Sequence, residues 1–259
     1  MKRFKLLTLL FVVIMMSFTL NEHKPVLYII GDSTVKNGDG TGRNGQVGWG
    51  SVIDVYFDTS KITVLNLAIG GRSSRTFITD GRWDKILTTL QKGDYVIMQF
   101  GHNDDGALDD TARARGTIKG IGDDSTEIYN PIRKIKEVVH SYGWYMRKYV
   151  NETKAKEATA IVCSPIPRNE WKNGKVVRSP DSYAGWAKQV AEQTGAYFID
   201  LNDMIATKYE NMMDTAKVHS FFPADHTHTN KEGAVLNAQT VVTGIKELKK
   251  CDLKKYLLQ

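Results

Sequence analysis

The sequence has little cysteine: its 259 residues include two, Cys163 and Cys251. Two isolated cysteines exclude a zinc site built on cysteine ligands. In an exported protein they could form a disulfide, and they could equally be buried and free, so both alternatives stay open.

The sequence also lacks any cluster of lysine and arginine of the kind that binds nucleic acid. The formal net charge is +6, but the first twenty residues contain three basic residues and no acidic one, so the remainder carries +3. Beyond residue 20 there is no apolar run long enough to cross a bilayer. These absences argue against a nucleic-acid-binding protein and against a membrane span in residues 21–259.

The first twenty residues differ from the rest of the chain. Lys2, Arg3 and Lys5 precede an almost wholly apolar stretch at residues 6–20. This pattern predicts a secretory signal peptide and therefore an exported protein, either periplasmic or secreted. An uncleaved membrane anchor is the alternative, although fifteen apolar residues are short for a span. No clear cleavage motif follows, and no cysteine follows that would favour a lipoprotein.

Residues 21–259 contain no repeat, low-complexity tract or linker, so we expect a single domain. Short apolar runs alternate with amphipathic segments, which predicts a parallel sheet with helices on both faces. The predicted strands are 26–30, 62–67, 95–100, 158–163 and 196–199, and the predicted helices are 49–57, 82–91, 142–156, 182–194, 201–213 and 232–249. Residues 171–180 and 215–230 are predicted loops. Residues 107–140 show only a weak apolar pattern near 132–139, and such long irregular segments often serve as functional loops or lids.

A polar turn follows the first predicted strand: Gly31-Asp32-Ser33. Ligands of open α/β sheets bind beyond the carboxyl ends of the strands, which makes Ser33 a candidate nucleophile. We expect Gly31 to let the chain bend and Asp32 to have a packing or turn role. Taken alone, the triplet is also ordinary turn chemistry.

Three further polar clusters lie after predicted strands or in the last loop. Gly70-Gly71 could point backbone amides at an anion, Asn103 follows the third strand, and Asp225 precedes His228 by three residues. An aspartate at that spacing can orient the histidine ring; a metal site using Asp225, His226 and His228 is the alternative. A Gly-x-Gly-x-x-Gly match at residues 40–45 lies ten residues beyond its strand, so a loop is the better interpretation than a dinucleotide site.

Together these clusters supply the parts of a serine acyl transferase: a nucleophile, a base, an orienting acid and donors for an oxyanion. The sequence has no Gly-x-Ser-x-Gly elbow, which argues against an ordinary α/β-hydrolase. The strings Gly31-Asp32-Ser33-Thr34-Val35, 71–75, 100–104 and 225–229 resemble the conserved blocks of the SGNH (GDSL-type) hydrolases. In detail they are similar to the rhamnogalacturonan acetylesterase branch of that family.

The resemblance implies a flavodoxin-like three-layer α/β/α fold with a central parallel sheet of about five strands, and no cofactor or metal. It also implies the catalytic roles. Ser33 would be the nucleophile, His228 the base and Asp225 the orienting acid. The oxyanion would be held by the backbone N–H groups of Ser33 and Gly71 and by the side-chain amide of Asn103.

The implied activity is removal of acetyl groups from plant cell-wall polysaccharide, with rhamnogalacturonan (pectin) as the first candidate. Arg72, Arg75 and Arg168 could contact galacturonate carboxylates, and Trp171 could stack on a sugar ring. The alternatives are an acetylxylan or small acetylated-sugar esterase, a general short-chain or lipid esterase, and a non-catalytic carbohydrate-binding protein. The sequence predicts no oligomeric state.

Overall fold

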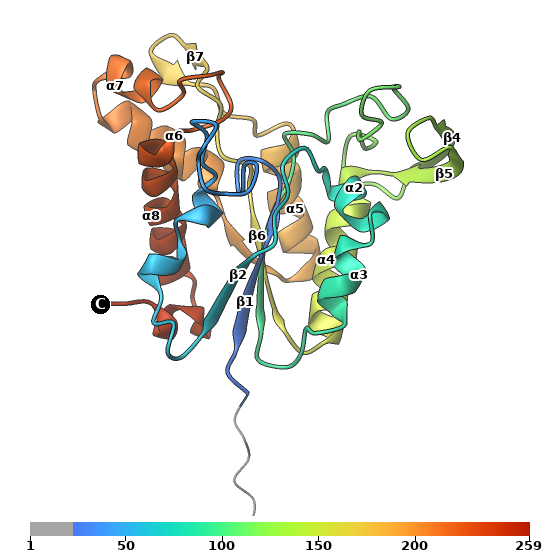
Figure 1. Cartoon of the computed structure of the whole chain (residues 1–259), viewed down its shortest axis with the longest axis horizontal. Helices are drawn as coiled ribbons and strands as arrows, with labels where there is room; N and C mark the ends of the chain where they lie inside the picture. Colours follow the sequence, from blue (N-terminus) through green and yellow to red (C-terminus); the bar gives the residue numbers. More distant parts are fainter. Residues whose placement is uncertain (1–22) are drawn as a thin grey trace, which may run out of the picture.

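A computed structural model of the chain describes residues 23–259, and its centre is a five-stranded parallel sheet (Figure 1). The predicted signal peptide at residues 1–20 lies outside the described residues. The strand order is β2-β1-β3-β6-β9, and all neighbouring strands run parallel. The strands are β1 (Val26–Gly31), β2 (Thr63–Asn66), β3 (Tyr95–Gln99), β6 (Thr159–Cys163) and β9 (Tyr197–Ile199). All five predicted strands are confirmed to within two residues.

Helices cover both faces of this sheet, which confirms the three-layer prediction (Figure 1). One face packs against α6, α8 and the 3₁₀ turns η1, η2 and η3, and the other packs against α2, α3, α4 and α5. The helices are α2 (Ser74–Thr79), α3 (Arg82–Leu87), α4 (Tyr142–Ala155), α5 (Tyr183–Thr194), α6 (Leu201–Asn211), α7 (Thr215–Ser220) and α8 (Lys231–Glu247), and the 3₁₀ turns are η1 (Trp49–Ser51), η2 (Asp54–Tyr56) and η3 (Asp252–Tyr256).

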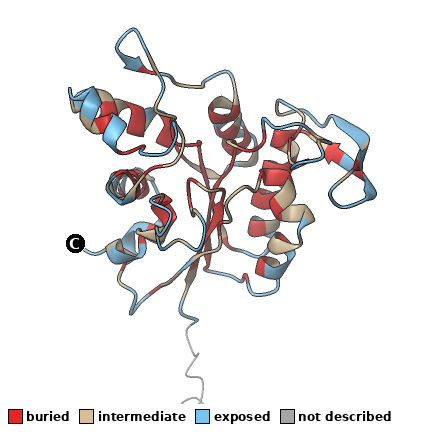
Figure 2. Ribbon diagram, turned by 45° about the horizontal axis from the view of Figure 1, so that its top comes forward, coloured by how far each residue is buried: buried red, intermediate tan, exposed pale blue. Residues whose placement is uncertain are grey.

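Strand β1 connects the two cores. Its side chains alternate, so Leu27 and Ile29 enter one core and Tyr28 and Ile30 enter the other. Figure 2 shows the central sheet and the inner faces of the helices buried, with exposure on loops, outer helix faces and the outlying hairpins. A strand buried on both faces reads as a continuous apolar run, which is why β1 was predictable.

The strand order reverses direction at β1, because β2 lies on one side of it and β3 on the other. Connections from neighbouring strands leave in opposite directions at such a point, and a crevice opens at the carboxyl ends of the strands. Ser33 follows β1 directly, so the fold places it at this crevice.

The predicted helix at 49–57 is wrong: the segment forms η1 and η2, two separate 3₁₀ turns. The N–H groups of Trp49 and Gly50 donate to the carbonyls of Thr34 and Val35, 3.1 and 2.9 Å away, so the segment is tied to the β1 loop. The β-branched Val52, Ile53 and Val55 also disfavour a continuous helix.

Segments for which no strand or helix was predicted contain six short elements. Strands β4 (Ser125–Asn130) and β5 (Ile135–His140) form an antiparallel hairpin within residues 107–140. A second hairpin, β7 (Trp171–Lys172) and β8 (Lys175–Val176), turns at Asn173-Gly174, a pair that favours tight hairpin turns. Helix α2 begins shortly after the Gly70-Gly71 turn, and helix α7 lies within the predicted loop 215–230. Helix α3 is shorter than the predicted helix 82–91.

The two cysteines are buried and unpaired. Cys163 ends β6 and Cys251 follows α8, and both pack in the core beside α8. The structure therefore has two free cysteines and no disulfide between them. Within residues 23–259, no helix is long and apolar enough to cross a membrane.

Candidate active site

The Ser33 turn depends on the absence of a side chain at Gly31. A Cβ atom there would lie 2.5 Å from the Gln99 carbonyl oxygen and 2.6 Å from a methyl group of Val35. Gly31 does not have a positive φ angle, so glycine is required here for its missing side chain and not for a left-handed conformation. It allows β1 and the following turn to pack closely against β3, and that packing sets the position of Ser33.

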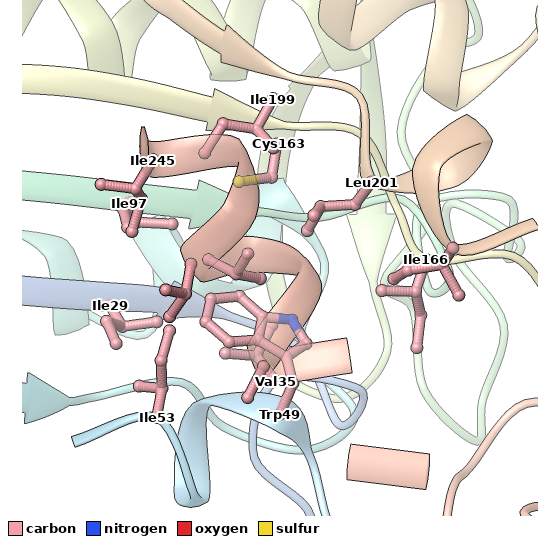
Figure 3. Close-up of a cluster of buried hydrophobic side chains, with 14 of the residues drawn as sticks. Ile29, Val35, Trp49, Ile53, Ile97, Cys163, Ile166, Ile199, Leu201 and Ile245 are labelled. Atoms are coloured by element: carbon pink, nitrogen blue, oxygen red, sulfur yellow. The ribbon is translucent and has the colours of Figure 1, made fainter. Parts of the chain in front are cut away.

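A buried chain of hydrogen bonds supports the turn from below. Asp32 accepts from the N–H and the hydroxyl of Thr34, 2.8 and 2.7 Å away. The Gln99 amide donates to the same Thr34 hydroxyl at 2.6 Å, and the Trp49 indole N–H donates to Gln99 at 2.9 Å. Figure 3 shows the Trp49 ring packed beside Val35 in the core. The turn role predicted for Asp32 is confirmed, and the chain of bonds anchors the Ser33 loop to the sheet.

His228 lies against Ser33. Its Nε2 atom is 2.8 Å from the Ser33 Oγ, and its Nδ1 atom is 2.7 Å from the Asp225 Oδ2. Because an ionised carboxylate only accepts hydrogen bonds, Nδ1 carries the ring proton and Nε2 is left to accept the serine hydroxyl proton. Three residues separated by almost two hundred positions thus form one hydrogen-bonded line.

The local loop geometry makes Asp225 suitable for this position. Its second carboxylate oxygen accepts the backbone N–H groups of Thr227 and His228, at 2.7 and 2.8 Å. Partial burial acts to raise the pKa of Asp225, but the hydrogen bonds from the His228 ring and from the two backbone groups outweigh it, so the pKa lies below its ordinary value. Asp225 is therefore ionised at neutral pH, as an orienting acid must be.

The His228 loop is tied to the Ser33 side of the sheet. Val47 and Thr229 exchange two hydrogen bonds: the Val47 N–H donates to the Thr229 carbonyl at 2.7 Å, and the Thr229 hydroxyl donates to the Val47 carbonyl at 2.9 Å. The Asn169 N–H donates to the His226 carbonyl at 2.7 Å on the other side. These bonds hold the histidine loop between the β1 and β6 loops.

Hydrogen-bond donors converge beside Ser33. Gly71 has a φ angle of +77°, a left-handed conformation that favours glycine. Within residues 23–259, the backbone N–H groups of Ser33 and Gly71 have no acceptor. The Asn103 amide donates one hydrogen to the Arg72 carbonyl at 2.9 Å and keeps the other for a ligand.

A hollow of about 840 Å³ contains Ser33, Gly71, Asn103 and His228. The structure thus brings together the predicted nucleophile, base and oxyanion donors at one surface. A hydroxyl facing an imidazole nitrogen, beside unused N–H groups, is the arrangement that acyl transfer requires.

The predicted sugar contacts divide into two groups. Arg72 and Arg168 line the hollow. Trp171 does not: it lies in β7, packs partly against the core and donates its indole N–H to Asn169 at 2.9 Å.

The prediction that Arg75 contacts the substrate is wrong, because its side chain is fully buried. Its Nε atom donates to Glu137 at 2.8 Å, and one Nη donates to the carbonyls of Leu108 and Gly116. Arg75 therefore anchors residues 107–140 to α2.

Sequence reasoning missed three arginines that line the hollow: Arg113, Arg115 and Arg133. All three lie in residues 107–140, where no strand or helix pattern indicated which side chains would face Ser33. The concentration of arginine in that segment was the available signal.

The metal alternative gains no support from the geometry. Within residues 23–259, no three His, Cys, Asp or Glu side chains are grouped to hold a metal ion. His226 points to Glu170, 3.6 Å away, whereas His228 is engaged by Asp225 and Ser33.

Residues 29–236 match the model of the GDSL-like lipase/acylhydrolase family. The chain belongs to this family. Membership makes it a carboxylic ester hydrolase, and the SGNH resemblance seen in its motifs is confirmed.

Curated relatives cover most of the chain. A rhamnogalacturonan acetylesterase of Emericella nidulans is 34% identical over 221 residues, which are 85% of this chain and 84% of the relative. A probable rhamnogalacturonan acetylesterase of Bacillus subtilis, YesY, is 31% identical over 86% of this chain and 93% of its own. An acetylxylan esterase of Geobacillus stearothermophilus is 26% identical over 74% of this chain and 85% of its own.

Solved structures support the fold. The crystal structure of the Bacillus subtilis protein YxiM matches with a TM-score of 0.69 at 25% identity, covering 86% of this chain and 56% of YxiM. The acetylxylan esterase Axe2 of Geobacillus stearothermophilus matches with a TM-score of 0.57 at 18% identity, covering 87% of this chain and 95% of Axe2.

Proposed function

We propose that this protein removes acetyl groups from rhamnogalacturonan through an acetyl-enzyme on Ser33. The single observation that carries this proposal is the continuous line from Ser33 Oγ through the His228 ring to Asp225, with bonds of 2.8 and 2.7 Å. The names of the relatives in Emericella nidulans and Bacillus subtilis support the choice of substrate.

The first half-reaction transfers the acetyl group to the enzyme. Ser33 Oγ attacks the ester carbonyl carbon while His228 Nε2 takes its proton, and Asp225 stabilises the resulting imidazolium. The carbonyl oxygen becomes negative and accepts hydrogen bonds from the N–H groups of Ser33 and Gly71 and from the Asn103 amide. When the bond to the sugar oxygen breaks, His228 returns the proton to that oxygen, and acetyl-Ser33 remains.

The second half-reaction uses water as the nucleophile. His228 takes a proton from a water molecule that attacks acetyl-Ser33, and the oxyanion forms again at the same donors. The bond to Ser33 Oγ breaks, Oγ regains a proton from His228, and acetate leaves. Because the His228 side chain is partly exposed, water has access to this step.

The polar lining of the hollow supports a sugar ester over a long-chain lipid ester. Five arginines and three asparagines line the hollow, and these side chains can hydrogen-bond the hydroxyl and carboxylate groups of a sugar chain. The predicted signal peptide supports export to the periplasm or medium, where polysaccharide is met.

Acetate release from acetylated rhamnogalacturonan, acetylated xylan and acetylated chitin fragments, measured side by side, tests the proposal. We expect the highest kcat/KM on rhamnogalacturonan and no release by Ser33→Ala. The acetylxylan esterase relative makes xylan the second candidate, and higher kcat/KM on xylan would replace the proposed substrate.

Two further controls separate the remaining alternatives. Faster hydrolysis of octanoyl than of acetyl esters would identify a lipid-directed esterase. Binding of the polysaccharide without any acetate release would identify a non-catalytic carbohydrate-binding protein.

A further inference from the structure

The hollow at Ser33 is rich in positive charge. Five arginines line it, and among its described lining residues Asp80 is the one with a carboxylate. The arginines are Arg72, Arg113, Arg115, Arg133 and Arg168. The catalytic steps proposed above need none of these guanidinium groups, so their concentration requires another explanation.

Two of the five arginines lie within ion-pair distance of protein carboxylates, each of which also pairs with a second arginine. Arg72 donates to Asp80 at 2.6 Å, and Arg133 lies 3.6 Å from Glu137. These pairs explain Arg72 and Arg133 as residues that brace loops.

The other three have no such pairing. Within residues 23–259, the guanidinium groups of Arg113 and Arg168 have no hydrogen bond or ion pair. Arg115 donates to the Gly71 carbonyl at 3.2 Å, and no carboxylate lies within ion-pair distance of it. Burial, followed by repulsion from Arg113, lowers the pKa of Arg115 from its ordinary value, although nearby aspartates act in the opposite direction.

The turn that presents Arg113 is closed by Asp110. This carboxylate accepts the backbone N–H groups of residues 112, 113 and 114, at 2.8, 2.6 and 3.1 Å. It is therefore engaged with backbone, although it still reduces the positive charge nearby. The residues that follow this turn are tied to the loop after β3, because the Thr117 N–H donates to the Asp104 carbonyl at 2.9 Å. The turn thus holds Arg113 and Arg115 beside the oxyanion donors.

The two sides of the hollow come from different connections. Arg113 and Arg115 belong to the segment that follows β3, whereas Arg168 follows β6. Guanidinium groups bind carboxylates with paired, charge-assisted hydrogen bonds. A chain that carries acidic groups on either side of an acetylated sugar could meet both sides at once.

We propose that Arg113, Arg115 and Arg168 form a binding site for uronate carboxylates at and near the acetylated sugar. The proposal rests on the proposed function for its substrate class. It adds the residues that select an acidic polysaccharide over a neutral one, and it assigns that selection mainly to residues 107–140.

The test uses Arg113→Gln, because Arg113 is exposed and its substitution disturbs no bond within the described residues. The matched control is Lys134→Gln, which removes one exposed positive charge from the β4–β5 turn, outside the hollow. Both changes are made in the Ser33→Ala background, and binding of unacetylated rhamnogalacturonan oligosaccharide is compared with binding of its methyl-esterified, uncharged form.

We expect Arg113→Gln to weaken binding of the charged oligosaccharide about tenfold, with a much smaller change for the methyl ester. This difference should shrink as salt is added, and Lys134→Gln should bind both forms as the parent does. Equal affinity of Arg113→Gln and Lys134→Gln for the charged form would overturn the proposal, and so would an equal loss for both forms.

The active enzyme supplies a second readout. In Arg113→Gln or Arg168→Gln, the ratio of kcat/KM on acetylated rhamnogalacturonan to that on acetylated xylan should fall about tenfold. Binding to the Ser33→Ala protein involves no chemistry. Charge-dependent binding by a wild type that releases no acetate would therefore refute the proposed function and leave this inference standing.

Discussion

The loops that carry Ser33, Asn103 and His228 differ from residues 107–140 in how they are held. The Ser33 and Asn103 loops directly follow strands, and the His228 loop directly precedes α8. Backbone hydrogen bonds hold these loops, and the buried chain of bonds from Asp32 to Trp49 also supports the Ser33 loop. Residues 107–140 extend away from the sheet (Figure 1). Their hairpin exposes Tyr129, Ile135 and Val138. A buried ion pair, Arg75–Glu137, attaches them to the core.

The difference assigns separate tasks to the two regions. Acyl chemistry needs atoms held to within fractions of an ångström, which suits loops tied to strands. Selecting a polymer by charge tolerates a looser frame, because ionic attraction acts over several ångströms. We therefore expect changes in the catalytic loops to reduce the turnover of every ester, and changes in residues 107–140 to alter the choice among polysaccharides.

The largest effect should come from Asp225→Asn. The Asn carbonyl oxygen can still accept the N–H groups of Thr227 and His228, but its NH₂ group would face His228 Nδ1 and favour the wrong tautomer. We expect kcat to fall about 10⁴-fold on every acetyl ester. The control is His226→Gln in the same loop, and a loss below tenfold in Asp225→Asn would contradict the assigned role.

The next effect concerns the attachment of residues 107–140. Arg75→Met leaves Glu137 buried with weaker compensation and removes the donors to two carbonyls, so we expect a loss of about 3–5 kcal/mol in unfolding free energy. Urea unfolding measures the loss, and hydrogen exchange should locate it in residues 107–140.

The double variant Arg75→Met/Glu137→Met provides the control, because it removes both charges and should recover much of the lost stability. Unchanged hydrogen exchange in residues 107–140 of the single variant would contradict the anchoring role.

A somewhat smaller effect is expected from Asn103→Ala, which removes one oxyanion donor. We predict a loss of about 10²–10³ in kcat with little change in KM, because the bond forms mainly in the transition state. Steady-state kinetics on one small and one polymeric acetyl ester check this, with Asn151→Ala on the exposed side of α4 as control. If the loss appeared in KM alone, Asn103 would be a substrate-binding residue instead.

The smallest effect, taken per pH unit, concerns Asp104, next to Asn103. Burial raises its pKa to about 7, against the hydrogen bonds from Ser74. Between pH 4 and 7 the folded protein then keeps a proton that the unfolded chain has lost, so stability should fall as pH rises, by up to about 1.4 kcal/mol per pH unit. Urea unfolding should show this slope reduced in Asp104→Asn and retained in Asp105→Asn, and equal slopes in all three proteins would refute the shift.

The loops that carry Ser33 and Asn103 could be predicted from sequence because each follows a buried strand, and the apolar runs of those strands are unambiguous. Asp225 and His228 follow no strand and were identified by their spacing in the last loop. The structure places Ser33, Asn103 and His228 around one hollow, with Asp225 bonded to His228. The joining of Ser33 to His228 was predicted from the chemistry and from the family resemblance, since no local pattern relates positions so far apart.

Residues 107–140 could not be predicted because their burial pattern opposes their polarity. In β5, the charged Glu137 is buried while Val138 is exposed, so an alternation of apolar and polar residues gives the wrong face. The cause is Arg75, whose burial in turn depends on Glu137, 62 positions away. The sequence neighbours of Arg75 and of Glu137 would each predict an exposed side chain. Both side chains are buried because they pair with each other.

Helix α2 escaped prediction for a different reason. It has six residues, it contains the β-branched Thr76, Ile78 and Thr79, and its capping box pairs Ser73 with a threonine in place of the usual glutamate or glutamine. Nothing in so short a segment separates it from a Gly-rich loop.

The most direct test of the central claim is covalent labelling of Ser33. A fluorophosphonate should add one equivalent to the wild-type protein and stop acetate release, with the mass increase on the peptide that contains Ser33. Ser33→Ala should take up no label. Acetate release that continues in fully labelled protein, or in Ser33→Ala, would contradict an acetyl-enzyme on Ser33.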